Sequence, residues 1–124
     1  MAGAGAGSTG SKNPTIRILF GASTSLGPGK IALLEAIAHC GSISAAARTM
    51  QMSYRRAWLL VEAMNQAFKQ PVVLTAAGGK GGGGAEITPF GHDLLGRYRV
   101  IEAKAAAAVG ADLAALNQFL ITLR

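Results

Sequence analysis

The stretch that decides the fold runs from Gly41 to Trp58 and reads GSISAAARTMQMSYRRAW. Ser42 is a good N-cap for a short helix that ends near Met50. After a short turn, Ser53 can cap a longer helix that continues to about Lys69. A short capped helix, a turn and a longer capped helix together indicate a helix-turn-helix.

Basic and hydroxyl side chains gather at the start of the longer helix, where Tyr54, Arg55 and Arg56 follow Ser53. A helix N-terminus favours phosphate groups through its free N–H groups and its dipole. Arginine and tyrosine placed there can contact phosphates or base edges in the major groove of DNA. We therefore predict a DNA-binding surface, with a solvated basic turn as the alternative. The predicted residues are Ser42, Ser44, Arg48, Ser53, Tyr54, Arg55, Arg56 and Lys80.

The charge balance agrees with an anionic partner. The net charge is +6, and Glu62 is the only acidic residue between Arg48 and Lys80. Such a balance favours nucleic acid, an acidic protein or a membrane surface. No window approaches the roughly 20 apolar residues of a membrane span, and the N-terminus does not resemble a secretory signal. We expect a cytoplasmic protein without membrane contact.

A strand and a further helix are predicted before the motif. The strand covers Thr15–Phe20 and a loop covers Gly21–Gly29, whereas residues 1–14 are expected to be a disordered tail ahead of one domain at 15–124. The helix should run from Pro28 to His39 and end at Gly41 as a C-cap. Its buried face should consist of Ile31, Leu34, Ile37 and Ala38.

A hairpin is predicted after the motif, with strands at 72–75 and 85–88. The segment between them is rich in glycine, and Lys80 at its tip could reach a phosphate backbone or a minor groove, unless the segment is only a linker. This order of elements predicts a mainly α fold with a small β wing, a winged helix-turn-helix.

A long C-terminal helix should begin at Thr88 and Pro89, reach about Val109 and break at Gly110, before a final segment capped by Asp112. Apolar residues in it step by four and three, which is the spacing of a helix–helix seam. We therefore expect a homodimer, joined through Leu94, Tyr98, Ile101, Ala105 and Ala108.

Patterns typical of enzymes are missing from the sequence. Gly79-Lys80 is followed by Gly81 and not by the Ser or Thr of a phosphate loop. The two histidines, His39 and His92, have no carboxylate or cysteine cluster near them in the sequence, and zinc-type Cys/His spacing does not occur. We expect no catalytic residue, no metal and no cofactor.

Several side chains are instead expected in the core. Cys40, the only cysteine, should be a buried structural thiol, since an inward-facing cysteine usually acts as a small hydrophobe. Trp58 should be a core anchor. The apolar face of the longer helix should consist of Ala57, Val61, Met64 and Phe68.

Four segments together resemble the N-terminal DNA-binding domain of ModE-type molybdate-responsive regulators and, more loosely, the helix-turn-helix of LysR-type regulators. These segments are GSISAAA at 41–47, SYRRAW at 53–58, EAMN at 62–65 and GGKGGGGA at 78–85. The serine-tyrosine-basic segment and the glycine wing are specific in combination, and either alone would be weak.

The resemblance implies a winged helix-turn-helix dimer that binds a palindromic operator in double-stranded DNA and regulates genes of molybdate uptake or molybdoenzymes. The recognition positions it implies are Ser53, Tyr54, Arg55 and Arg56, with Lys80 in the wing. Full-length members carry molybdate-binding domains after this half, so we expect no small-molecule effector within this chain. The alternatives are a winged-helix protein-interaction module without DNA binding and a phosphate- or nucleotide-binding protein that uses the glycine-rich loop.

Overall fold

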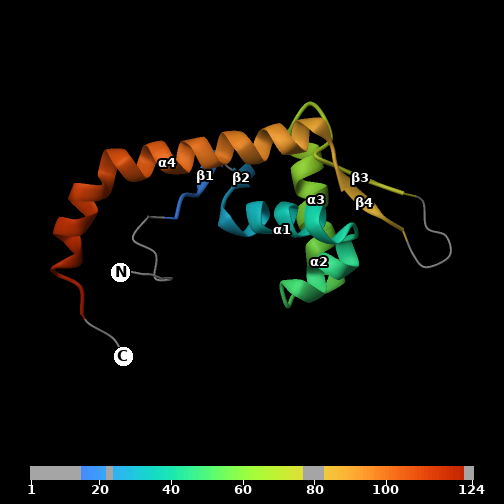
Figure 1. Ribbon diagram of the computed structural model, residues 1–124, viewed down its shortest axis with the longest axis horizontal. Coiled ribbons are helices and arrows are strands. Elements are labelled where there is room, and N and C mark those ends of the chain that lie inside the picture. The colour runs from blue at the N-terminus through green and yellow to red at the C-terminus, as the bar shows by residue number, and fades with distance from the viewer. Residues whose placement is uncertain (1–14, 22–23, 77–82, 122–124) are drawn as a thin grey trace. The chain divides into compact units, whose positions relative to one another are not determined.

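The computed structural model describes residues 15–21, 24–76 and 83–121 (Figure 1). The residues from Arg17 to Tyr98 form one compact unit, and those from Arg99 onward belong to another. The elements in chain order are β1 (Ile18–Phe20), β2 (Thr24–Leu26), α1 (Pro28–Cys40), α2 (Ile43–Thr49), α3 (Tyr54–Ala67), β3 (Val73–Thr75), β4 (Ala85–Ile87) and α4 (Pro89–Asn117). This arrangement confirms the predicted winged helix-turn-helix with a long C-terminal helix.

Helix α1 lies at the centre of the Arg17–Tyr98 unit and contacts α2, α3 and β4. Ile31, Leu34 and Ile37 are buried as predicted, but Ala38 is exposed. Leu33 is fully buried in its place. The prediction assumed a single covered face, whereas contacts with two helices and a strand cover a wider arc of α1.

Two caps that the sequence predicted lie where α1 ends and α2 begins. Gly41 has φ +80°, and its N–H donates to the carbonyl oxygen of Ile37 at 2.8 Å. The Ser42 hydroxyl accepts from the N–H of Ala45 at 3.0 Å. Glycine suits the left-handed conformation that turns the chain at this point, and α2 then starts at once.

The turn between α2 and α3 closes with two backbone bonds. The N–H of Met52 donates to the Ala47 carbonyl at 3.0 Å, and the N–H of Gln51 donates to the Arg48 carbonyl at 3.1 Å. This pair of bonds is the Schellman arrangement. Its left-handed residue is Gln51, with φ +58°. The turn thereby holds α3 at a defined angle to α2.

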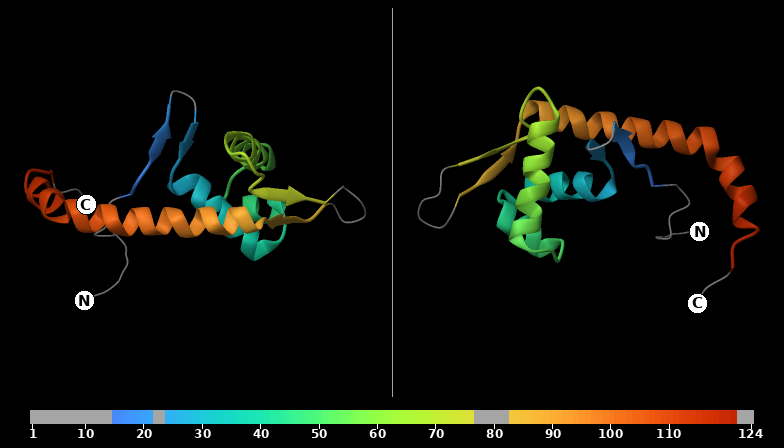
Figure 2. Two further views of the ribbon diagram at one scale, coloured as in Figure 1. Left: turned by 90° about the horizontal axis from the view of Figure 1, so that it is seen from above. Right: turned by 180° about the vertical axis from the view of Figure 1, so that it is seen from behind.

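The two hairpins lie at opposite ends of α1 (Figure 2). The first corrects the sequence prediction, because β2 pairs antiparallel with β1 where a loop was expected. Thr24 and Ser25 carry no apolar pattern, so only the pairing with β1 reveals the strand. Phe68, which is half-buried, contacts Phe20 of this hairpin and Phe90, with ring centroids 6.5 and 5.5 Å away.

The second hairpin is the predicted wing, in which Val73 pairs with Ile87 and Thr75 with Ala85. The N–H of Ala85 donates to the Gly41 carbonyl at 2.8 Å, which attaches the wing to the turn between α1 and α2. Lys80 and the rest of the predicted tip at 77–82 lie outside the described residues.

Helix α4 starts as predicted and ends later than predicted. The buried hydroxyl of Thr88 accepts from the N–H of Gly91 at 2.8 Å and donates to the Pro71 carbonyl at 2.7 Å. The predicted break at Gly110 is wrong, because the helix continues to Asn117. The alanine-rich flanks of Gly110 favour helix strongly enough to outweigh one glycine, which costs about 1 kcal/mol.

Cys40 is half-buried, not buried as expected, and its Sγ lies 3.7 Å from the Thr49 hydroxyl.

No single helix among the described residues is long and apolar enough to cross a membrane. The pair α1 and α2 reaches that length and composition only together, with a bend of 119° between them.

Candidate nucleic-acid interface

The start of α3 presents the predicted basic residues to solvent. The Ser53 hydroxyl accepts from the N–H of Arg56 at 3.0 Å and so caps the helix as predicted. Ala57, Val61 and Met64 turn one side of α3 into the core. Tyr54, Arg55 and Arg56 are all exposed. The first turn of α3 is therefore an accessible surface and not part of the packing.

A groove of about 410 Å³ runs along one side of α3. It joins the starts of α2 and α3 to the base of the wing. Ser42, Ser44 and Tyr54, which the sequence predicted as DNA-binding, lie together along it, and Trp58 joins them. The remaining lining residues are Ile43, Thr75, Ala76, Gly83, Gly84 and Ala85.

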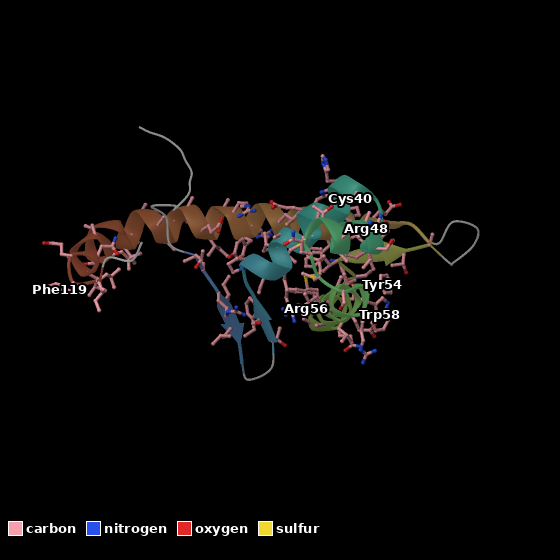
Figure 3. The ribbon with its side chains drawn as sticks, turned by 90° about the horizontal axis from the view of Figure 1, so that it is seen from below. Cys40, Arg48, Tyr54, Arg56, Trp58 and Phe119 are labelled. Carbon is pink, nitrogen blue, oxygen red and sulfur yellow. The ribbon has the colours of Figure 1, made fainter. Side chains whose placement is uncertain are left out.

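A second hollow, of about 290 Å³, lies on α3 itself. Its lining residues are Ser53, Arg55, Arg56, Leu59 and Leu60. Figure 3 shows Tyr54 and Trp58 on one side of α3 and Arg56 on the other. The structure thus divides the predicted residues of α3 between two neighbouring surfaces of one helix.

Trp58 was expected in the core, and the structure corrects that expectation. Its side chain is 42% exposed and lines the groove. The core side of α3 is occupied by Ala57, Val61 and Met64, and position 58 falls about 100° away from Ala57 around the helix. Trp58 directly follows Ala57 in the sequence and therefore lies well away from the predicted apolar face of this helix. Sequence reasoning gave that spacing too little weight.

The arginines of this surface carry uncompensated charge. Among the described residues, no carboxylate forms an ion pair with Arg48, Arg55 or Arg56. Arg97, in contrast, donates to Asp93 at 2.8 Å, and this hydrogen bond raises the pKa of Arg97 above its ordinary value. Described carboxylates therefore leave the charges of these three arginines on α2 and α3 uncompensated, while Arg17 before β1 and Lys30 in α1 carry further positive charge elsewhere in the unit. Arg48 is exposed on the last turn of α2 and lines neither hollow.

Asn65 connects the wing to α3, a role that the sequence prediction missed. Its Oδ1 accepts from the N–H of Val72 at 2.7 Å and from the N–H of Val73 at 3.1 Å. Its Nδ2 donates to the Val73 carbonyl at 3.0 Å. One side chain thus satisfies three backbone groups where β3 begins, and this fixes the wing beside α3. Asn65 directly follows the buried Met64, and a polar side chain so close to the core was the available sign that it bonds to other parts of the chain.

The predicted dimerisation residues fall into two groups. Leu94 and Tyr98 are buried inside the Arg17–Tyr98 unit, so the protomer itself uses these side chains. Ile101 and Ala108 are exposed, and Ala105 is half-buried. A seam between two copies would therefore depend on the part of α4 from Ile101 onward.

No group of three or more His, Cys, Asp or Glu side chains that could hold a metal occurs among the residues for which the structure gives positions. His39 and His92 are exposed and lie on different helices. The described surface offers hydroxyl, aromatic and guanidinium groups, which suit a phosphate backbone and base edges.

Comparisons with known proteins agree with this geometry. The model of the family "bacterial regulatory helix-turn-helix protein, lysR family" matches residues 29–92. The molybdenum-pterin-binding protein MopB of Rhodobacter capsulatus is 48% identical over 92 residues, which are 74% of this chain and 34% of that protein.

Two further relatives, named for molybdenum transport and for transcriptional regulation, also match this chain over about a third of their own length. The molybdenum transport protein ModE of Azotobacter vinelandii is 37% identical over 95 residues, 77% of this chain and 35% of the relative. The DNA-binding transcriptional dual regulator ModE of Escherichia coli K12 is 43% identical over 74 residues, 60% of this chain and 28% of the relative. The chain thus spans about a third of the length of these relatives. The resemblance to the ModE-type DNA-binding domain is confirmed.

Proposed function

The chain belongs to the bacterial regulatory helix-turn-helix proteins of the lysR family, and from that premise we propose that it is a sequence-specific DNA-binding transcriptional regulator. One observation carries the proposal. The exposed first turn of α3 holds Arg55 and Arg56, which have no carboxylate partner among the described residues, beside a groove that leads to the wing.

In this proposal α3 is the recognition helix and lies in the major groove. Arg55 and Arg56 contact base edges or phosphates from its first turn, because arginine can bond guanine or phosphate with two N–H groups. Ser42, Ser44, Tyr54 and Trp58 face the sugar–phosphate backbone from the groove beside it. Arg48 and the wing residue Lys80 add further phosphate contacts.

The target genes are proposed from the relatives. Proteins named for molybdenum transport and for molybdenum-pterin binding share 37–48% identity with this chain. We therefore propose that the chain regulates genes of molybdate uptake or of molybdoenzymes. Selection of bound fragments from genomic DNA tests this, because the enriched operators identify the neighbouring genes.

We further propose that the chain acts as a homodimer on a palindromic operator, with Ile101, Ala105 and Ala108 in the seam between copies. Two recognition helices related by a two-fold axis would then contact half-sites about 34–36 Å apart. Light scattering should give twice the monomer mass of 12.6 kDa. A monomer at micromolar concentration would contradict this part of the proposal.

The DNA-binding surface is tested by titrating the enriched operator and a scrambled duplex at several salt concentrations. Phosphate contacts release counterions, so the affinity should fall steeply as salt rises. The double variant Arg55→Ala/Arg56→Ala should lose most of the discrimination between the two duplexes.

Lys69→Ala is the matched control, since it removes an exposed charge just beyond the other end of α3. Its discrimination between operator and scrambled duplex should stay close to that of the unaltered chain. Binding that does not depend on salt or on sequence would point to a protein-interaction module and would contradict the proposed function.

A further inference from the structure

Three large apolar side chains are exposed on α3: Tyr54, Trp58 and Leu59, at 55%, 42% and 45% of their surface. Tyr54 and Trp58 line the groove beside the wing. Leu59 lies elsewhere, in the second hollow with Arg55 and Arg56. An exposed leucine in the same hollow as two exposed arginines needs an explanation of its own.

Packing within the protomer does not supply that explanation. Position 59 is two residues beyond the buried Ala57, which places it about 200° around the helix and so on the side opposite the core. Arg55 and Ala63, one turn before and one turn after Leu59, are also exposed. These three positions form a line along the outward surface of α3, charged at its start and apolar beyond it.

The chemistry of that line matches one group in the major groove. Leucine offers neither a donor nor an acceptor, so it cannot satisfy the polar edge of guanine, cytosine or adenine. Thymine alone presents a methyl group in the major groove, and apolar side chains contact it there. The exposed positive charges of Arg55 and Arg56 attract the phosphate backbone to the same surface.

We propose that Leu59 is a specificity-determining residue that contacts the 5-methyl group of a thymine in the operator. This inference rests on the proposed DNA-binding function and adds the base that α3 selects. Four helical residues advance about 6 Å, close to two base steps of about 3.4 Å each. The thymine therefore lies within about two base pairs of the position that Arg55 contacts.

The test replaces each thymine of the selected operator, one at a time, by deoxyuridine. This exchange removes only the methyl group and keeps every hydrogen-bonding group. At one position of each half-site the affinity of the unaltered chain should fall about fourfold, the factor expected for one buried methyl-sized group.

Leu59→Ala should bind the thymine and deoxyuridine operators equally well. Leu59→Gln keeps the length of the side chain and should also lose the preference for thymine. Leu19→Ala, which shortens another exposed leucine at 69% exposure on β1, is the control and should keep the full fourfold response. Thermal melting should show that all three variants remain folded.

The outcomes separate the inference from the function on which it rests. Sequence-specific binding with no response to deoxyuridine at any position overturns the role of Leu59 and leaves the proposed function standing. A fourfold response that persists in Leu59→Ala also overturns that role. Equal affinity of the unaltered chain for operator and scrambled duplex overturns both.

Discussion

Replacing Asn65 tests how much its bonds to Val72 and Val73 contribute to the free energy of unfolding. Asn65→Ala removes the acceptor of the Val72 and Val73 N–H groups and the donor to the Val73 carbonyl. Val72 and Val73 are almost completely buried, at 0% and 2% exposure. Water therefore cannot easily replace the lost partners.

The size of the effect follows from these contacts. A buried polar group left without a partner costs about 1–3 kcal/mol. Two N–H groups are stranded, so we expect the free energy of unfolding to fall by about 3 kcal/mol. A unit the size of Arg17–Tyr98 loses about 4–8 °C of melting temperature per kcal/mol, which gives a decrease of about 12–24 °C.

Urea denaturation followed by circular dichroism measures this loss, and thermal melting measures the shift in temperature. Gln66→Ala is the matched control. Gln66 is exposed, and its Nε2 donates to the half-buried Glu62 at 3.1 Å. Its loss should stay within about 0.5 kcal/mol.

The reasoning would be refuted by an Asn65→Ala variant that unfolds within about 0.5 kcal/mol of the unaltered chain. In that case the start of β3 would be held by its pairing with β4 and not by α3.

Three other predictions concern the same unit. Arg55→Ala should weaken operator binding by about 1–3 kcal/mol and leave the melting temperature nearly unchanged, because the side chain is exposed; equal losses of binding and stability would place Arg55 in the packing. Trp58, the only tryptophan, should show solvent-exposed fluorescence that acrylamide quenches and that operator DNA shields; a blue-shifted, protected emission would contradict its place in the groove. Gly91→Ala should destabilise the unit by about 1–3 kcal/mol in urea denaturation, because the added Cβ would overlap the Val72 carbonyl oxygen and lie 2.5 Å from the Ile87 side chain; an unchanged midpoint would mean that β3 can shift freely.

The order of the helices, their caps and the wing could be predicted from the sequence because the signals are local. Ser42, Ser53 and Thr88 each bond an N–H three residues later, within one turn of their own helix. Gly41 adopts the left-handed conformation that glycine favours. Such bonds depend on neighbours in the chain, so a sequence pattern is enough to indicate them.

The exposure of Arg55 and Arg56 could also be predicted, since both precede the first buried residue of α3 and charged side chains are rarely buried without a partner. The separation of Tyr54 from these two arginines, on two different surfaces of α3, could not. It depends on where α2 and the wing lie relative to that helix, which is a matter of contacts between distant segments.

Tertiary structure alone decided the roles of the apolar and amide side chains. The helical period of α3 does not say which arc of the helix is covered, so Trp58 was placed in the core although it lines the groove. Leu94 and Tyr98 fit a seam by spacing, yet the protomer buries them itself. β2 exists because β1 lies beside it. Asn65 matters because the start of β3 returns to α3, where the N–H groups of Val72 and Val73 bond to the Asn65 side chain. Hydrophobic burial is non-directional, so only the assembled neighbours determine which apolar residues face inward and which remain available to DNA.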